Sequence, residues 1–481
     1  MSQSVARNTA FITFASIAQK VISFVYFTLI ARNIGAENTG KYIFALSFTT
    51  IFVVFVDLGL NQVLIREGAK NKENLQKYLS SVLFIKLFLG IFTYITAVVT
   101  INLMGYPIET RQLVYLSAVT MLFDSLHLSI YGVLRAYGNL KYEAWGIVMT
   151  QALTLIMGTI FLYLKFPLIF LILAFTIPSF INVCYATIIL FIKYHISLRL
   201  KWDKVVMKFF LKITIPFALA AIFARVYSYI DSILLSKLMG DKEVGWYSIP
   251  YKITYAFQFI PSALVAVLYP KFSEYFVQDK NKLVYILERG IKYLLIIVFP
   301  IVFGISILAK DIVLSLYTSE YLNSILPLKI LLVGLIFSFI SFPLGAFLNA
   351  CNKQVSQTVI VFFIMLINII SNLILIPRLG VVGAAISALI GNFCLVLFSL
   401  FIIPKIAKIS HSFIFKSLIQ ILLATLVMSV VVWYTNLHFH YLIAVIVGGV
   451  VYILALFIFR VITKTQLKEV YLLINKKSSS A

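Results

Sequence analysis

Two basic residues lie inside long apolar stretches of this chain of 481 residues, where an ionised side chain needs a partner. Lys20 lies in the first stretch, and Arg225 lies in a later one that begins near Thr214. A charged group at membrane depth is costly unless it faces protein, water or a bound ligand. Lysine and arginine make charge-assisted hydrogen bonds to phosphate oxygens, and arginine can form two in parallel. Both residues are therefore candidates for binding a phosphate-bearing anion.

The two stretches are related by an internal repeat. A shift of 205 positions superimposes Lys20 on Arg225, Gly35 on Gly240, Gly40 on Gly245, and Tyr42 on Tyr247. Repeats of this kind in membrane transporters place the binding site at the repeat interface. The repeat predicts two six-helix lobes, residues 1–205 and 206–403, and a further segment of two helices and a tail, 404–481. We expect all four glycines to be turn residues.

The composition predicts an all-α membrane protein. The chain is 62% hydrophobic and only 12% charged, and its apolar runs of about 20 residues are each long enough to cross a bilayer. Within lipid, a helix satisfies its own backbone hydrogen bonds. We predict about 14 transmembrane helices, six in each lobe and two after them.

The charge distribution predicts the orientation. The chain has 40 Lys and Arg against 17 Asp and Glu, a net charge of +23. Most of the basic residues fall in alternate loops, which is typical of the cytoplasmic side of a membrane protein rather than of a nucleic-acid surface. We therefore expect a multi-pass protein of the plasma (inner) membrane, with both termini and the basic tail in the cytoplasm and no nucleic-acid partner.

Several segment boundaries follow from local patterns. A span from about Tyr42 to Ile65 is followed by a basic loop, Arg66–Lys77. The linker Lys193–Lys212 alternates cationic and apolar residues, which is typical of an interfacial amphipathic helix. In a later span, Pro250 and Pro261 should kink or break the helix.

Further ionisable residues fall within predicted spans: Asp57, Asp124, His127, Asp231 and Lys252. The three acids and the histidine are candidates for ion coupling or for ion pairs in a cavity. Asp124 with His127 either relays protons or satisfies a neighbouring lysine. For Lys252, two interpretations stay open, because it either lines the cavity or reaches the membrane interface.

Three other predictions concern pairing. Lys20 either binds the anion or pairs with Asp57 or Asp124 as a lock between helices. Asp231 lies six residues beyond Arg225, on a different side of the helix, so we expect no salt bridge between them. Lys86 and Lys292, at related positions of the repeat, are expected to extend their side chains to the membrane interface.

Seven motifs occur in a specific order between about Asn8 and Ile403: ARNIGAENTGKY, DLGLNQVLIRE, YGVLRAYGNLKYEA, RVYSYIDSILLSKLMGDKEVGWY, LYPKFSEY, LYTSEYLNSILPLKIL and NLILIPRLGVVGAA. This order resembles the polysaccharide-transport branch of the MOP (MVF) flippase superfamily, which includes the Wzx-type oligosaccharide flippases. The resemblance implies that the two six-helix lobes are related by pseudo-twofold symmetry and enclose a V-shaped cavity. It implies that a polyprenyl-(pyro)phosphate-linked oligosaccharide is moved from the cytoplasmic to the outer leaflet by alternating access.

The resemblance also implies the partners. They are the lipid-linked glycan, membrane lipids, a coupling ion (H⁺ or Na⁺) and other membrane proteins of polysaccharide assembly. No cofactor or metal is expected, since Cys184, Cys351 and Cys394 have no ligand-like spacing.

Two alternative functions within the superfamily stay open. Fourteen spans exceed the twelve usual in the oligosaccharide branch and are closer to the lipid II flippases. A multidrug exporter of the MATE type should have a cavity lined by carboxylates, whereas the cavity predicted here is net cationic. An enzyme is not expected, because the outer loops are short and have no nucleophile constellation.

Overall fold

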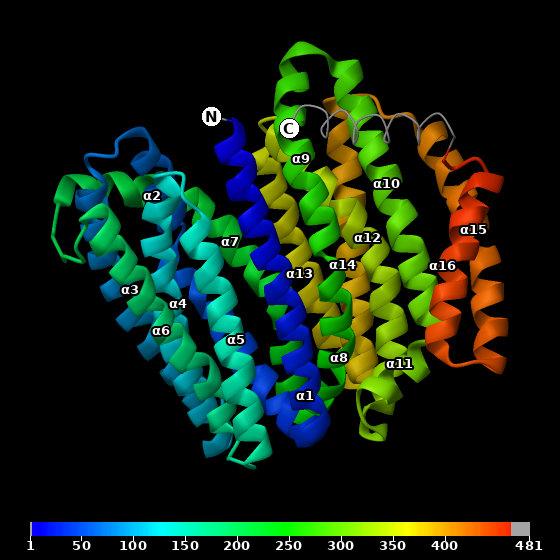
Figure 1. Cartoon of the computed structure of the whole chain (residues 1–481), viewed down its shortest axis with the longest axis horizontal. Coiled ribbons are helices and arrows are strands. Elements are labelled where there is room, and N and C mark those ends of the chain that lie inside the picture. Colours follow the sequence, from blue (N-terminus) through cyan, green and yellow to red (C-terminus); the bar gives the residue numbers. More distant parts are fainter. Residues whose placement is uncertain (1, 463–481) are drawn as a thin grey trace. The chain divides into compact units, whose positions relative to one another are not determined.

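The computed structural model describes residues 2–462 as a bundle of helices, with no strand among these residues (Figure 1). Thirteen of its helical segments are long and apolar enough to cross a membrane. The first, Phe11–Asp57, contains two of the predicted spans, so the structure agrees with the predicted all-α membrane fold of about 14 transmembrane helices. The predicted cytoplasmic tail beyond residue 462 lies outside the described residues.

The elements follow one another along the chain with short connections (Figure 1). In order, they are α1 (Ser2–Asp57), α2 (Leu60–Lys70), α3 (Leu75–Leu103), α4 (Ile108–Ala136), α5 (Lys141–Tyr163), α6 (Ile169–Tyr194), α7 (Lys204–Met239), α8 (Asp241–Phe257), α9 (Phe259–Gln278), α10 (Lys280–Ile307), α11 (Ala309–Leu316), η1 (Ser319–Ser324), α12 (Ile325–Ala350), α13 (Gln354–Leu379), α14 (Val381–Ile402), η2 (Ile403–Lys405), α15 (His411–His438) and α16 (Tyr441–Ile458).

The chain divides into two compact units. Unit 1 comprises Met1–Lys252 and Val361–Ala384, and unit 2 comprises Ile253–Ile360 and Ala385–Ala481. Unit 1 therefore contains α1–α7 and most of α8 and α13. The lobe boundaries drawn from the repeat stay a prediction.

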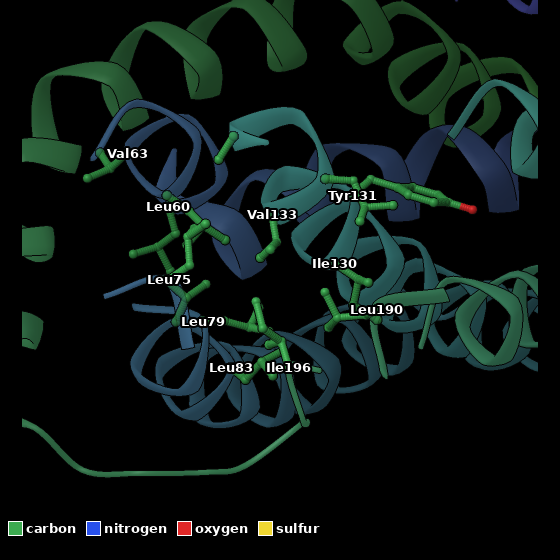
Figure 2. Close-up of a cluster of buried hydrophobic side chains, with 14 of the residues drawn as sticks. Leu60, Val63, Leu75, Leu79, Leu83, Ile130, Tyr131, Val133, Leu190 and Ile196 are labelled. Atoms are coloured by element: carbon green, nitrogen blue, oxygen red, sulfur yellow. The ribbon is translucent and has the colours of Figure 1, made fainter. Parts of the chain in front are cut away.

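Unit 1 has an apolar cluster where α2, α3, α4 and α6 meet (Figure 2). In α2, Leu60, Val63 and Leu64 are fully buried, and their spacing of three and four residues puts them on one helical face. They pack in the cluster with side chains of the other helices, among them Leu75, Leu79, Ile130, Val133 and Leu190. One prediction is corrected here. The basic stretch Arg66–Lys77, expected as a loop, begins within α2.

The second predicted span is also shorter than expected. Its helix ends at Asp57, and the next two residues have positive φ, 45° at Leu58 and 85° at Gly59. This left-handed conformation ends a right-handed helix and reorients the chain. The break at this position places Asp57 at the end of α1, where its carboxylate can meet α3.

The two turns of the internal repeat have the same backbone. Gly35 interrupts α1 with φ 75°, and Gly240 separates α7 from α8 with φ 97°. Only glycine adopts this region without strain, so the prediction that these two residues form turns is confirmed. The second turn is a single residue, because α8 already begins at Asp241.

The other pair of repeat-related glycines has a different role. Gly40 and Gly245 lie inside helices, where α1 and α8 approach each other closely. A Cβ atom on Gly40 would lie 1.7 Å from the carbonyl oxygen of Asp241, and one on Gly245 would lie 1.9 Å from that of Ala36. The two contacts are exchanged by the shift of 205 positions, as a local twofold axis requires. The prediction that both are turn residues is wrong.

The stretch Lys193–Lys212, predicted as one amphipathic helix, is helical only in part, because its second half, from Lys204, belongs to α7. Residues 195–203 are non-helical. The side-chain amide of Gln76 accepts from the Ser197 N–H at 2.9 Å and donates to the Ser197 carbonyl at 2.8 Å. The Gln76 side chain thereby satisfies the backbone N–H and C=O groups of Ser197, which would otherwise form hydrogen bonds within a helix. Asp203 then accepts from the Val206 N–H at 3.0 Å and caps α7.

The expected break in the span that contains Pro250 and Pro261 is confirmed. α8 ends at Phe257 and α9 begins at Phe259. Pro261 has no N–H to donate to the Phe257 carbonyl, four residues earlier, which explains the position of the break. Pro250 lies inside α8 without ending it.

Unit 2 is centred on α10, which packs against α9, α12 and α15. The last two helices, α15 and α16, pack on each other. The Tyr452 hydroxyl of α16 donates to the Ile296 carbonyl of α10 at 2.7 Å. The final helix pair is therefore an integral part of unit 2.

Candidate functional site

A first polar group of unit 1, here called the Asp57 cluster, joins α1, α2, α3 and α4. It consists of Asp57, Asn61, Lys86, Ser125 and Ser129. The Lys86 ammonium lies 2.7 Å from the Asp57 carboxylate and donates to Asn61 Oδ1 at 3.1 Å and to Ser125 Oγ at 3.0 Å. Ser129 donates to the same Asn61 oxygen at 2.9 Å. The cluster is thus an ion pair whose ammonium group also donates hydrogen bonds to neutral oxygen atoms.

This geometry overturns two interpretations of the lysines. The Lys86 side chain is only 1% exposed, so it does not extend to the interface. Lys292, at the related position of unit 2, is also buried and donates to the Val461 carbonyl at 2.7 Å. Both lysines are held inside the protein because each finds an oxygen acceptor there. Arg66, which follows on α2, pairs with Glu67 at 2.8 Å.

Asp124 and His127 lie next to the Asp57 cluster on α4. Asp124 accepts a hydrogen bond from Ser179 of α6, and His127 Nδ1 lies 3.8 Å from Asp124 Oδ1. The His127 ring meets the edge of the Tyr131 ring at 5.7 Å, and the Tyr131 hydroxyl donates to Asn182 at 2.6 Å. These contacts tie α4 to α6. A proton-relay role for the pair stays a prediction.

A second polar group of unit 1, the Asp231 cluster, joins α7, α8 and α13. It consists of Asp231, Tyr247, Asn368 and Asn372. The Asp231 carboxylate is 6% exposed. It accepts from the Tyr247 hydroxyl at 2.9 Å and from Asn372 Nδ2 at 2.6 Å. Its donors are therefore neutral groups, in contrast to those of Asp57.

The Asp231 cluster also contains polar atoms without partners. Within residues 2–462, the side-chain amide oxygens of Asn368 and Asn372 have no hydrogen-bond partner. Both residues are fully buried. Buried amide groups normally find partners, and each exception needs an explanation such as an ion or a water. One carboxylate and two amide oxygens close together form a set of hard ligands suited to a small cation.

The three predicted cations lie on three helices of unit 1. Lys20 is partly buried on α1, Arg225 is exposed on α7, and the Lys252 ammonium on α8 lies 5.3 Å from the ring centre of Phe27. Phe27 is two helical turns beyond Lys20 on α1. No ion pair is found for Arg225 within the described part of the chain, so the expectation that it does not bridge to Asp231 agrees with the structure.

The end of α7 is tethered by the linker between α3 and α4. The Tyr106 hydroxyl lies 3.1 Å from Ser236 Oγ, which donates to Asp241 at 2.7 Å. Lys237 donates to the Met104 carbonyl at 2.6 Å. Burial raises the pKa of Tyr106 to about 12, which keeps the phenol protonated and able to donate. These contacts fix the turn at Gly240.

Sequence reasoning found Asp231 and missed its amide neighbours. Asn368 and Asn372 are four residues apart in an apolar helix, which puts them on one face. That spacing was the available signal. Among residues 2–462, no group of three or more His, Cys, Asp or Glu side chains could hold a metal ion.

Comparisons with known proteins place the chain in a wider context. The family model described as "Polysaccharide biosynthesis protein" matches residues 5–276, and the MatE model matches residues 216–374. The uncharacterized membrane protein MJ1068 of Methanocaldococcus jannaschii is 24% identical, over 93% of this chain and 94% of its own length. The capsular polysaccharide biosynthesis protein CapF of Staphylococcus aureus is 24% identical, over 80% of this chain and 96% of its own.

Two further similarities concern flippases. The protein named "Probable flippase AglR" of Haloferax volcanii is 30% identical, over 34% of this chain and 35% of its own. A solved structure of the lipid II flippase MurJ, in an inward closed conformation, matches with a TM-score of 0.76 and 21% identity. It covers 93% of this chain and 98% of the MurJ chain. At that identity, the match shows a shared fold.

Proposed function

The chain belongs to the polysaccharide biosynthesis protein family, and on this premise we propose that it is a flippase for a polyprenyl-(pyro)phosphate-linked oligosaccharide. It moves this lipid from the cytoplasmic to the outer leaflet for the synthesis of cell-surface polysaccharide. Its relatives include a protein of capsular polysaccharide biosynthesis and one named as a flippase. It works in the plasma (inner) membrane with both termini in the cytoplasm.

The observation that carries the proposal is the cation on α7. Arg225 is exposed in the middle of a span, Ala218–Met239, and has no carboxylate partner within the described residues. An intramembrane arginine without a structural partner needs a ligand or water. A diphosphate group supplies the oxygens that a guanidinium binds best. Lys20 and Lys252 provide the other cations of the same binding site.

The Asp231 cluster supports a coupling role. Its buried carboxylate has only neutral donors, and neighbouring amide oxygens have no partners. We propose that it binds Na⁺ and that the ion's electrochemical gradient drives the return of the empty transporter. A transporter can convert such a gradient into alternating access when the ion binds one conformation better than the other.

The proposal is tested with purified protein in proteoliposomes that contain a fluorescent polyprenyl-diphosphate oligosaccharide. Wild type should expose the glycan at the opposite leaflet. Arg225→Gln should slow this step at least tenfold, as should Lys20→Gln and Lys252→Gln. Lys353→Gln removes a cation from an exposed turn and should leave the rate unchanged. Matched melting temperatures confirm that every variant is folded.

Two outcomes would reject the proposal in favour of an alternative. If wild type moves lipid II but not the oligosaccharide, the chain is a peptidoglycan-precursor flippase. If it moves neither lipid and exports organic cations along an ion gradient, it is an exporter of the MATE type.

A further inference from the structure

Unit 2 contains a cavity of about 520 Å³ that the proposed flippase mechanism does not use. One wall is the first three turns of α10, and the other is the connector between α14 and α15, residues 404–410. Both walls lie at ends of candidate membrane spans, Lys280–Ile307 and Val381–Lys405. The cavity is therefore at the boundary between hydrocarbon and water, on the side that the charge distribution predicts to be cytoplasmic.

The lining has an amphipathic composition. Two lysines line it, Lys280 from α10 and Lys408 from the connector, and both side chains are exposed. Val284, Ile406 and Ala407 supply apolar surface beside them. Two ammonium groups next to an apolar surface suit a ligand that joins a phosphate to hydrocarbon.

The walls are held together before any ligand binds. The Glu288 carboxylate of α10 accepts from the Ser410 N–H at 2.6 Å. Ser410 Oγ in turn accepts from the Phe413 N–H at 3.3 Å and caps α15. The Arg289 guanidinium lies 5.2 Å from the Tyr285 ring and 5.0 Å from the Phe413 ring. A rigid cavity loses little entropy when it binds a ligand.

The two carboxylates near these lysines, those of Glu288 and Asp279, do not prevent an anion from binding in the cavity. Glu288 is 9% exposed and is occupied by the Ser410 amide. Asp279 accepts from the Asn281 and Lys282 N–H groups at 3.0 and 3.1 Å, and it caps α10. Both carboxylates are therefore engaged by backbone donors, which leaves the two lysines as the groups that present charge to a ligand.

We propose that this cavity binds the headgroup of an anionic phospholipid, with the phosphate at Lys280 and Lys408 and the glycerol on the apolar surface. This site is independent of the proposed substrate site in unit 1. A bound lipid would hold α10 to the connector that leads into the last helix pair, since α10 and this connector form the two walls of the cavity.

The test is native mass spectrometry of the full chain in detergent, titrated with phosphatidylglycerol or with neutral phosphatidylcholine. Wild type should retain phosphatidylglycerol preferentially. The double variant Lys280→Gln/Lys408→Gln should bind it at least tenfold more weakly. The matched control, Lys271→Gln/Lys353→Gln, removes two exposed lysines of the same unit outside the cavity and should bind as wild type does.

A second variant keeps the charges. Ala407→Leu adds bulk to the apolar surface and should also weaken phosphatidylglycerol binding, even if the double variant does not fold. The proposal is wrong if the folded variants bind this lipid as tightly as wild type. It is also wrong if inorganic phosphate competes at the same concentration as the lipid, because the site would then recognise a free anion.

Discussion

Asp57 and Asp231 are two carboxylates of unit 1 in opposite electrostatic environments. Asp57 lies 2.7 Å from a lysine ammonium that is itself buried, whereas Asp231 accepts only from a phenol and an amide. The Asp57 side chain is also 24% exposed, and Asp231 is 6% exposed. The more buried carboxylate thus has the weaker compensation for its charge. A charge in that situation needs a proton or a cation.

The contrast distinguishes an ion pair that joins two helices, at Asp57, from a proposed cation-binding site, at Asp231. The ion pair of Asp57 with Lys86, whose charges compensate each other, joins α1 to α3. The Asp231 carboxylate, which has neutral donors, is the proposed cation site, and the nearby amide oxygens are its proposed further ligands. Each of the three predictions below changes one side of this comparison.

The largest effect is expected from the loss of the buried lysine. Lys86→Met leaves Asp57 without its counter-ion and should destabilise the protein by about 3 kcal/mol, at the low end for a broken buried pair because Asp57 is partly exposed. Thermal unfolding in detergent measures this as a lower melting temperature. The double variant Asp57→Asn/Lys86→Met should recover most of the loss, since no unpaired charge remains. Equal melting of wild type and Lys86→Met would show that the pair does not lock the helices.

The next effect concerns the cation. Na⁺ at a hundred times its dissociation constant should stabilise wild type by about 2.7 kcal/mol relative to the same concentration of K⁺. Asp231→Asn should lose this response, because it removes the only carboxylate of the cluster. Asp57→Asn should keep it. A Na⁺ response that survives in Asp231→Asn would place the ion elsewhere.

Features that depend on local geometry could be predicted from the sequence. The repeat located Gly35 and Gly240, because a positive φ is a property of the residue itself. Hydropathy located the membrane spans, and Asp231 stood out as an ionisable group within one of them. The order of the motifs pointed to the family that the comparisons then confirmed.

Features that depend on how helices rotate against each other could not be predicted. The pairing of Lys86 with Asp57 depends on the end of α1 before Gly59. The sequence does not show which residues of α1 and α3 face each other there. The extended linker is set by Gln76, whose partner is 121 residues away. Glycine is common in turns, so the sequence suggested turns at Gly40 and Gly245. Their actual role, a close contact between two helices, depends on how those helices pack.

The smallest effect on stability is expected from the loss of a single hydroxyl group at the Asp231 cluster. Tyr247→Phe removes a donor to Asp231 and should destabilise the Na⁺-free protein by about 1.5 kcal/mol, as for a hydrogen bond to a charged group. Since the carboxylate then has one donor fewer, it should bind Na⁺ more tightly, and the stabilisation by Na⁺ should increase. Tyr131→Phe removes another buried hydroxyl, which donates to Asn182 at 2.6 Å; it should lose stability without changing the Na⁺ response. If Tyr247→Phe responds to Na⁺ as wild type does, the Tyr247 hydroxyl does not compete with the ion for the Asp231 carboxylate.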